Sequence, residues 1–500
     1  MPKRSSGAIL AMLAPQRESS VPLQRQLYDA IRRAILEGGL PPGTRLPSSR
    51  GLAAEWGLGR NTVVNAFEQL AAEGYLESRI GSGTYVSDSL PEEFLQVQKD
   101  EPGPSKVESK GQLPVLSRRV EWYASLQMTP DPESPIPFSP GLPALDAFPV
   151  EQWRRIAARQ MRRITRSALS YGDPRGLDAL RRSLSSYLNT ARGVRCDWRQ
   201  ILILSSSQQA LDLCARVLLE PGEKVWMEEP GYLGARGALG AAGARLVPIP
   251  VDDEGINVEE GIGRAPEARM VYVTPSHHFP LGSMLSLGRR LALLEWASRS
   301  GAWILEDDYD SEFRYAGQPL ASLQGLDESG RVFYVGTFSK VLFPSLRLGY
   351  LVVPEALLDA FTSARALMDG HPPGFTQRIL ADFIGEGHFS AHIRRMRGLY
   401  RRRMKVLVEA LREAFPEGPT VAPVDSGMHL VLDLEKEADD RALSRTLGDS
   451  RIDAPSLSRY YLADPQRKGL MLGFCGVPSH ELKRGTSVLK RVLEEQAFQD

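Results

Sequence analysis

The 500-residue sequence has few cysteines, no long apolar run and no excess of either charge. Its three cysteines, Cys196, Cys214 and Cys475, lack the spacing of a metal site, and their odd number argues against a disulfide framework. No stretch approaches the roughly 18 apolar residues of a transmembrane helix, and the first twenty residues are too broken in hydrophobicity for a signal peptide. We therefore expect a soluble, cytoplasmic protein without a metal site or a membrane span.

The overall composition is that of a folded protein with several domains. Hydrophobic residues make up 42% and charged residues 24%, which excludes disorder as the main state. The length suggests about two to four domains. Because 61 basic residues balance 61 acidic ones, any surface for nucleic acid has to be local.

Composition changes twice along the chain, which predicts three segments. Residues 1–87 have clear helical periodicity. Residues 88–134 are rich in proline, serine and charge, so we interpret them as a mostly flexible linker with a short helix near 115–126. Residues 135–500 alternate apolar runs with helical patterns. No internal repeat is visible.

The first segment predicts three helices followed by a hairpin. Apolar residues recur at helical spacing from Leu23 until Gly38. Ser48 is placed to cap a second helix that Gly57 ends, and a third helix runs from about 60 to 73. The glycine-rich stretch 81–83 then forms the tip of a hairpin.

This order is typical of a helix-turn-helix, whose later helix enters the major groove of DNA. Arg60, Asn61 and Thr62 lie at the start of that helix, where arginine and asparagine can contact base edges. Arg45 and Arg50 flank it as candidates for phosphate contacts. On pattern alone, a helical cap or a dimerisation module is the alternative.

The stretch GTRLPSSRGLAAEWGLGRNTVVNAFEQLAAEGYLESRIGSGTYV resembles the GntR-type winged helix across nearly its whole length. The resemblance implies binding to double-stranded operator DNA by Arg50, Arg60, Thr62 and the wing at Gly83, and hence a protein associated with the nucleoid. Gly59 stands where the family usually has a capping serine. Glycine at that position costs only a few tenths of a kcal/mol, so we expect DNA binding to survive.

The third segment predicts an α/β domain with a mostly parallel sheet covered on both faces, followed by a smaller α+β subdomain. Helical patterns at about 207–219, 233–243, 287–300 and 355–369 separate several of its strands. The expected strands are 201–204, 224–228, 245–251, 269–274, 302–306, 332–336 and 349–353. We interpret the six arginines within 394–403 as a solvated helix face with paired charges rather than a DNA-binding patch.

Several candidate catalytic or cofactor-binding residues follow these strands. Lys340 comes after strand 332–336, with Thr337 three residues before it and Arg347 seven after it. A lysine that forms a Schiff base with a phosphorylated cofactor needs an anion site nearby, which a hydroxyl and an arginine provide. Ser207 and Gln208 open the helix after strand 201–204, where free N–H groups favour a phosphate.

Two further side chains suit a planar, nitrogen-containing ring. Tyr232, in EPGY after strand 224–228, offers an aromatic face for stacking. Asp307, in EDDYDSEFRY, lies at the carboxyl end of a strand, where open α/β sheets bind ligands. A carboxylate there can keep a pyridine nitrogen protonated, which makes the ring an electron sink.

Together these motifs resemble the fold type I, pyridoxal-phosphate (PLP)-dependent aminotransferase superfamily over about residues 135–495. The resemblance implies that Lys340 bonds PLP covalently, that Asp307 pairs with the pyridine nitrogen and that Tyr232 stacks on the ring. It implies a homodimer in which Tyr171, in YGDPRGLDALR, reaches a phosphate in the partner subunit. The resemblance assigns the phosphate to Ser207, Gln208, Thr337 and Arg347.

A GntR-type domain, a linker and an aminotransferase-like domain in one chain resemble the MocR subfamily of bacterial transcription regulators. TPSHHFPLG, EDDYDSEFRY and HIRRMRGLYRRR are close to strings of that subfamily.

Three departures from an aminotransferase argue against turnover. Phe279 replaces the usual asparagine of Asn-Pro-x-Gly, and Tyr309, which we keep among the cofactor-binding candidates, lies one place early after Asp307. Met471 occupies the position of the arginine that captures the substrate carboxylate, although Arg236 or Arg365 offers a replacement clamp.

Two functions therefore compete: a PLP-binding transcription regulator with at most residual transaminase activity, and a working aminotransferase with an attached DNA-binding domain. Met471 and the winged helix favour the regulator. Its small-molecule effector is either PLP itself or an amino compound, and Met471 favours PLP or an amine without an α-carboxylate. The operator, the target genes and the direction of regulation do not follow from the sequence.

Overall fold

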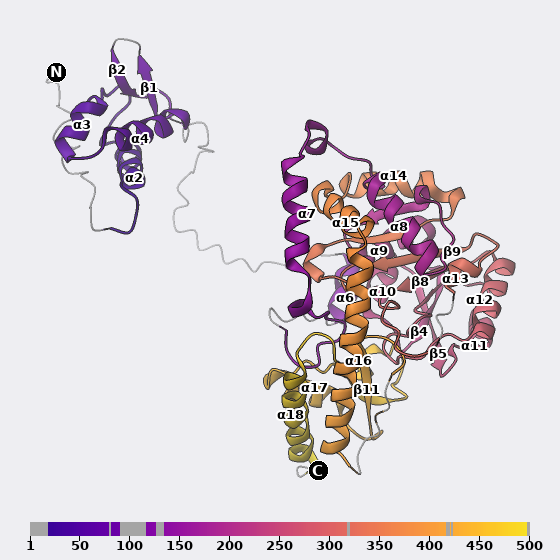
Figure 1. The fold of residues 1–500 in the computed structure, drawn as a ribbon. Helices are drawn as coiled ribbons and strands as arrows, with labels where there is room; N and C mark the ends of the chain where they lie inside the picture. The colour runs from indigo at the N-terminus through magenta and orange to yellow at the C-terminus, as the bar shows by residue number, and fades with distance from the viewer. Residues whose placement is uncertain are drawn as a thin grey trace, which may run out of the picture. The chain divides into compact units, whose positions relative to one another are not determined.

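The computed structural model describes residues 19–79, 82–90, 117–126, 135–317, 321–416, 421 and 424–497. The chain divides into two compact units, Met1–Val115 and Leu116–Asp500 (Figure 1). None of the helices in the described residues is long and apolar enough to cross a membrane.

The first unit is a small winged helix. Its core is formed by residues such as Leu27, Ile31, Val63 and Leu70, which are fully buried where α2 and α4 pack together. Its strands pair antiparallel as the wing. The elements are α2 (Leu23–Leu36), α3 (Ser49–Trp56), α4 (Arg60–Ala72), β1 (Leu76–Arg79) and β2 (Gly83–Val86).

Local sequence signals account for the ends of these helices. The Ser48 hydroxyl accepts a hydrogen bond from the Gly51 N–H at the start of α3, and Gly57 ends α3 in the left-handed region at φ 63°. Both predictions are confirmed. Gly59 begins α4 without a side-chain cap. Of the predicted hairpin tip, Gly81 lies outside the described residues.

The second unit is built on an eight-stranded sheet of order β3-β10-β9-β8-β7-β4-β5-β6. Strands β5, β4, β7, β8 and β9 are parallel neighbours, while β10 runs antiparallel between β9 and β3. This confirms the mostly parallel sheet. The strands are β3 (Ile201–Leu204), β4 (Lys224–Glu229), β5 (Arg245–Asp252), β6 (Gly255–Ile256), β7 (Met270–Val273), β8 (Trp303–Asp308), β9 (Val332–Thr337) and β10 (Gly349–Val352).

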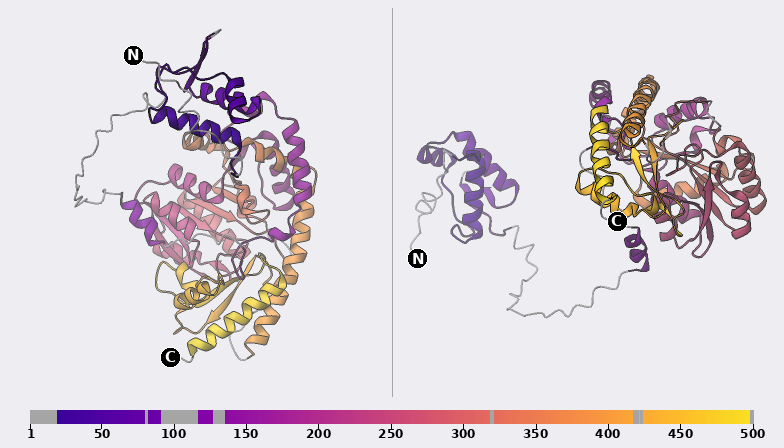
Figure 2. Two further views of the ribbon diagram at one scale, coloured as in Figure 1. Left: turned by 90° about the vertical axis from the view of Figure 1, so that its left-hand side faces the viewer. Right: turned by 90° about the horizontal axis from the view of Figure 1, so that it is seen from below.

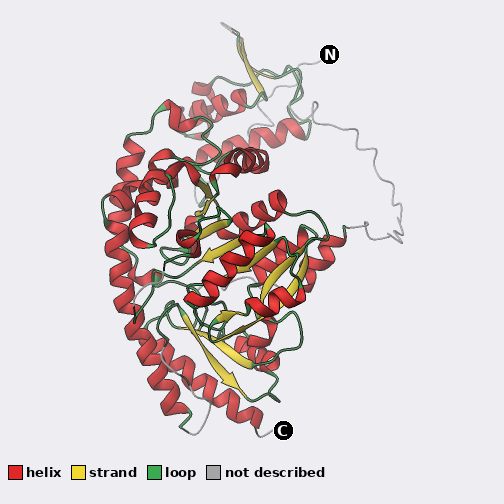
Figure 3. Ribbon diagram, turned by 90° about the vertical axis from the view of Figure 1, so that its right-hand side faces the viewer, coloured by secondary structure: helices red, strands yellow, loops and turns green. Residues whose placement is uncertain are grey.

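Helices cover both faces of this sheet (Figure 3). The central strands carry apolar side chains on both sides, and separate buried clusters form on the two faces. The helices are α7 (Val150–Arg162), α8 (Asp178–Ala191), α9 (Ser207–Leu218), α10 (Leu233–Ala241), α11 (Val258–Arg264), α12 (Leu287–Ser300), α13 (Leu323–Leu326), α14 (Leu358–Asp369) and α15 (Gly374–Gly385).

The C-terminal part forms the expected smaller subdomain. The long helix α16 (His388–Ala414) packs along α18 (Ser479–Ala497), beside an antiparallel pair of strands (Figure 2). The remaining elements are β11 (His429–Leu434), α17 (Asp440–Asp449) and β12 (Lys468–Gly473).

One helix of the second unit comes from the predicted linker. Helix α6 (Arg118–Ser125) lies against α10 (Figure 1). The sequence predicted a short helix near this position but not its contact with α10.

Candidate cofactor site and nucleic-acid interface

The predicted cofactor residues gather at one edge of the large sheet. Because β4, β8 and β9 are parallel, their carboxyl ends meet at the same edge, where open α/β sheets bind ligands. Asp307 is the last residue but one of β8, Lys340 lies three residues after β9, and Tyr232 lies three residues after β4. Strand β3 runs in the same direction and leads into Ser207 at the start of α9.

Lys340 and Asp307 lie near one another at this edge. Asp307 is 4% exposed, and burial raises the pKa of its carboxyl to about 7, while the Lys340 ammonium partly opposes this rise. The loop before α7 also approaches the lysine: a Cβ added to Gly141 would lie 2.9 Å from Lys340 Nζ. Glycine at 141 therefore leaves room beside the lysine amine, where a side chain would collide.

The two carboxyl oxygens of Asp307 differ in their hydrogen bonding. The Tyr272 hydroxyl donates to Asp307 Oδ2 at 2.8 Å, whereas the buried Oδ1 has no hydrogen-bond partner among the described residues. A buried oxygen without a partner is costly, which indicates a donor that the protein does not supply. A protonated pyridine nitrogen is a suitable donor, so this carboxylate fits the ring of PLP.

The backbone segments that carry Ser207, Thr337 and Arg347, three of the residues expected at the phosphate, lie next to one another. Ser206 caps α9, and Ser207 is its first residue, so backbone N–H groups point out of the helix start. Thr337 pairs in register with Gly349. A Cβ added to Gly349 would lie 3.0 Å from the Ser207 nitrogen, so the turn that carries Arg347, two residues earlier, runs beside the start of α9.

Gln208, Arg347 and Tyr171 lie in different surroundings. The Gln208 side chain donates to the Gly234 carbonyl at 2.8 Å and so ties α9 to α10. Arg347 is exposed and adopts the left-handed region at φ 51°. Tyr171 is 93% exposed, and its ring packs edge-on against His371.

Aromatic side chains form a wall next to Tyr232. The Phe279 ring packs edge-on against Tyr232, Tyr309 and Tyr460, with centroid distances between 5.2 and 5.9 Å. Phe279, which stands where aminotransferases usually have an asparagine, thus places a hydrophobic ring at the centre of this wall. His277 Nδ1 lies 2.9 Å from the Tyr309 hydroxyl, which fixes that tyrosine.

Met471 belongs to an apolar cluster rather than a polar one. It is fully buried on β12 and packs with Leu233 and Tyr460, with Phe279 alongside. Burial lowers the pKa of His429 to about 3, so this neighbouring histidine is neutral and offers no positive charge.

The two proposed replacement clamps are buried arginines with partners of their own. The Arg236 guanidinium donates to the Tyr460 carbonyl and lies 3.3 Å from Glu229 Oε2. Arg365, on α14, forms an ion pair with Asp369. Arg236 therefore lies at the edge of the cluster that holds Met471, because Tyr460 belongs to that cluster.

The sequence did not single out Tyr272, His429 or Glu228, although all three belong to the buried surroundings of the site. Tyr272 is recognisable in retrospect because it pairs with Leu305, two residues before Asp307, on the adjacent strand. His429 has no such signal, since it comes from the C-terminal subdomain.

Glu228 gives a pH-dependent prediction for stability. Its carboxyl accepts hydrogen bonds from the Thr274 N–H and hydroxyl, and burial raises its pKa from 4.5 to about 8. Between these pH values the folded protein holds a proton that the unfolded chain has lost. The free energy of unfolding therefore falls with rising pH, by up to about 1.4 kcal/mol per pH unit from this group.

We expect Glu228→Gln, which cannot ionise, to flatten the fall of Tm between pH 5 and 8. Thermal unfolding at a series of pH values measures this. Exposed Glu259→Gln is the matched control and should leave the slope as it is in the wild type. Equal slopes for Glu228→Gln and the wild type would contradict the buried, protonated state.

The predicted DNA contacts lie on one unit and most are exposed. Arg60 and Asn61 start α4, Arg50 is the second residue of α3, and all three are exposed, while Thr62 is half-buried. The wing is tied to the same surface: a Cβ on Gly83 would lie 3.1 Å from Arg45 Nε, and the φ of 116° at Gly83 also favours glycine. Arginines beside a helix start suit phosphate and base contacts.

Arginines within 394–403 form hydrogen bonds to other segments of the second unit. Arg397 donates to the Glu312 carbonyl, Arg401 to the Tyr315 carbonyl, and buried Arg403 to the Cys475 carbonyl and Asp146. Of the expected solvated face with paired charges, Arg403 has a charged partner in Asp146 but is buried, while Arg397 and Arg401 are exposed and donate to backbone carbonyls, so these side chains connect α16 to neighbouring loops.

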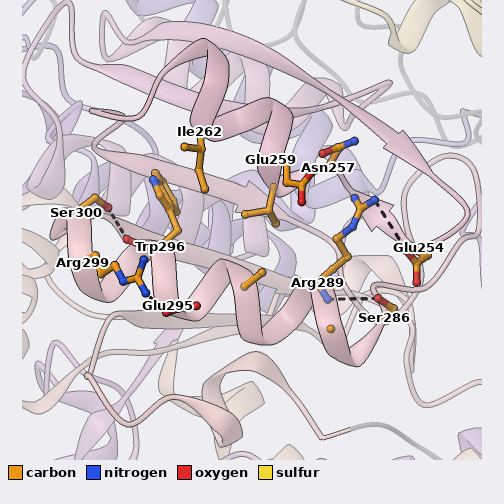
Figure 4. Close-up of a pocket in the computed structure, with 13 residues that line it drawn as sticks. Glu254, Asn257, Glu259, Ile262, Ser286, Arg289, Glu295, Trp296, Arg299 and Ser300 are labelled. Carbon is orange, nitrogen blue, oxygen red and sulfur yellow. Dashed lines mark hydrogen bonds and ion pairs between the residues drawn. The ribbon is translucent and has the colours of Figure 1, made fainter.

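A surface cavity of about 700 Å³ lies between α11 and α12 (Figure 4). Both arginines that line it are already paired, Arg299 with Glu295 and Arg289 with Asp252. Since none of the predicted cofactor residues lines it, we assign it no role.

Family models match both units. The family "Bacterial regulatory proteins, gntR family" matches residues 23–86, and "Aminotransferase class I and II" matches residues 135–464. These matches define a transcription regulator in which a winged-helix DNA-binding domain is joined to an aminotransferase-like domain. Aminotransferases of that class depend on PLP.

Known proteins resemble either nearly the whole chain or a large part of it. The chain is 40% identical to the probable rhizopine catabolism regulatory protein MocR of Rhizobium meliloti, over 96% of this chain and 95% of that protein. It is 31% identical to the pyridoxine biosynthesis transcriptional regulator PdxR of Corynebacterium glutamicum, over 92% of this chain and 93% of that protein. The kynurenine aminotransferase structure of Pyrococcus horikoshii matches 76% of this chain and 95% of its own, with 30% identity and a TM-score of 0.67.

The chain belongs to the MocR subfamily of GntR-type transcription regulators. This confirms the predicted family and fold class, and it favours the regulator over the enzyme as the protein's function.

Proposed function

We propose that this regulator binds PLP at Lys340 and that the ligand at this site changes the affinity of the winged helix for its operator. The observation that carries the proposal is the buried Asp307 carboxylate close to Lys340. Tyr272 donates a hydrogen bond to one of its oxygens, and the other oxygen has no partner within the part of the chain that the structure describes. When bound, PLP supplies an aldehyde that reacts with a lysine amine and a ring that acts as an electron sink.

Each residue of the site has a distinct task in this proposal. Asp307 holds a proton on the ring nitrogen, and Tyr272 fixes the orientation of Asp307. Tyr232 stacks on the ring, and Tyr309 lies beside it.

The backbone at the start of α9 and the side chains of Thr337 and Arg347 hold the phosphate, because N–H dipoles and a guanidinium favour an anion. Ser207 and Gln208 contribute the first N–H groups of that helix.

Exposed apolar side chains support a homodimer. Leu169, Tyr171 and Leu367 are 76%, 93% and 90% exposed, and such apolar side chains suit burial against a second subunit. In a dimer that covers these side chains, Tyr171 of one subunit would reach the phosphate site of the other subunit, as the resemblance implies. Two winged helices per dimer also suit a two-fold operator.

We further propose that residues 1–87 form the DNA-binding domain, 88–134 the linker and 135–500 the ligand-binding domain. The contacts to DNA come from Arg45, Arg50, Arg60, Asn61, Thr62 and Gly83. A protein with this role acts in the cytoplasm on the nucleoid.

A binding rather than a catalytic role fits the apolar surroundings of Met471. Without an arginine at that position, an α-amino acid lacks the paired hydrogen bonds that orient its carboxylate for turnover. At most residual transaminase activity is expected. The effector is therefore PLP itself or an amine without an α-carboxylate. An active aminotransferase with an attached DNA-binding domain remains the second candidate, because Lys340 and Asp307 suit both functions.

A gel shift tests the proposal. The purified chain is mixed with the DNA upstream of its own gene, with and without PLP, alongside Lys340→Ala. We expect PLP to change the binding of the wild type and not that of the variant. Specific binding that PLP leaves unchanged would overturn the role of PLP as effector. Absence of specific binding, with multiple turnover of an amino donor, would favour the aminotransferase.

Titration of amino compounds tests the effector class. We expect ordinary α-amino acids to leave the visible absorbance of the bound cofactor unchanged, because no arginine at 471 captures their carboxylate. In Met471→Arg, a saturable shift should appear with an α-amino acid. A saturable shift in the wild type would contradict the proposed class and indicate that Arg236 or Arg365 acts as the clamp.

A further inference from the structure

Helix α10 contains three glycines at three-residue spacing, Gly234, Gly237 and Gly240. Each costs about 1 kcal/mol of helix stability relative to alanine, so their presence calls for a structural reason. Gly234 faces the cofactor side: a Cβ there would lie 2.3 Å from Gln208 Oε1 and 2.5 Å from the Tyr232 ring. The other two glycines face α6.

Gly237 and Gly240 make the groove in which α6 lies. A Cβ on Gly240 would lie 2.2 Å from the Trp122 indole, and one on Gly237 would lie 3.3 Å from Leu126 Cδ1. The Trp122 indole N–H also donates to the Arg236 carbonyl at 3.2 Å. Trp122 and Leu126 are four residues apart and thus share one face of α6.

The docking of α6 rests on these two anchors. They are half-buried, while Val120 and Tyr123 are 40% and 52% exposed. A helix of eight residues is marginal in water without tertiary contacts. Docked and undocked arrangements of α6 therefore differ by few contacts, so that small movements of α10 can shift their balance.

Helix α10 also contacts the proposed ligand site. Tyr232 is its N-cap residue, and Leu233 packs with Tyr460 and Met471. The Arg236 side chain donates to the Tyr460 carbonyl, while its backbone carbonyl accepts from Trp122. One residue of α10 therefore contacts both the wall of the site and α6.

We propose that α6, seated in the glycine groove of α10, transmits the occupancy of the Lys340 site to the linker of the DNA-binding domain. A ligand that stacks on Tyr232 shifts α10, and this shift changes how firmly Trp122 and Leu126 are held. Among the described elements, α6 is the one that follows the winged helix in the sequence. This inference rests on the proposed function, and it requires that the ligand favours one arrangement of α6 over the other.

The test uses the full chain, PLP as the ligand and the upstream DNA. Gly240→Ala places a methyl group where the indole lies, and Trp122→Ala removes the indole and leaves the groove intact. Gly263→Ala is the matched control, because this glycine of α11 has open space around its Cβ position. PLP affinity, DNA affinity with and without PLP, and hydrogen exchange of residues 118–126 are measured for each protein.

In the wild type, we expect PLP to change DNA affinity by about 5-fold or more and to alter exchange in residues 118–126. Gly240→Ala and Trp122→Ala should bind PLP with about the wild-type affinity, yet PLP should change their DNA affinity by less than about 2-fold. Gly263→Ala should behave as the wild type.

Two results would overturn the coupling role of α6 while leaving the proposed function in place. In one, both variants keep the full response of DNA binding to PLP. In the other, both lose PLP binding itself, so that α6 supports the site rather than transmitting its state. A wild type that binds PLP without any change in DNA affinity or in the exchange of α6 would overturn both proposals.

Discussion

Lys340→Ala is expected to abolish the absorbance band of the Schiff base between PLP and the lysine, and to weaken PLP binding by about 100-fold or more, because the covalent bond to the cofactor is lost. The remaining hydrogen bonds to ring and phosphate would support only noncovalent binding. Absorbance spectra and equilibrium dialysis measure the two effects. The response of DNA binding to PLP should disappear with them at PLP concentrations that saturate the wild type.

Two controls separate the covalent bond from other effects at Lys340. Lys340→Arg keeps a positive charge near Asp307 but cannot form the bond, so it should lose the absorbance as well. Exposed Lys405→Ala, on α16, should keep both the absorbance and the affinity. Retained absorbance in Lys340→Ala would show that another amine holds the cofactor.

Arg60→Ala and Arg50→Ala are expected to weaken operator binding by about 10-fold or more each, since an arginine contact to a base or phosphate contributes about 1–3 kcal/mol. Both side chains are exposed, Arg60 at the start of α4 and Arg50 in the first turn of α3. PLP binding should be unchanged, because these residues belong to the other unit. Fluorescence anisotropy with labelled operator DNA measures the affinities.

Salt dependence distinguishes the two kinds of contact. Loss of a phosphate contact should reduce the slope of log affinity against log salt concentration by about 1, whereas loss of a base contact should relax sequence preference at one position. Exposed Arg33→Ala, in the last turn of α2, is the matched control and should have little effect. Equal losses at Arg33 and Arg60 would contradict α4 as the recognition helix.

The sequence by itself determined the features that depend on neighbours along the chain. Ser48 and Gly57 set the ends of α3 through bonds and dihedral angles within a few residues. The apolar runs of β3, β4, β7, β8 and β9 predicted a buried parallel sheet, and parallel strands bring the residues after their ends to one edge. This is why Lys340, Asp307 and Ser207, far apart in sequence, were expected together.

Only the tertiary structure decided which side chains face one another across these elements. Tyr272 meets Asp307 because of the register between β7 and β8, and His429 reaches the aromatic wall from the C-terminal subdomain. The seat of α6 on α10 depends on Gly240 opposite Trp122, 118 positions apart in the chain. Such pairs depend on packing between distant segments. The local periodicity that predicts a helix or a strand does not specify which other segment that element packs against.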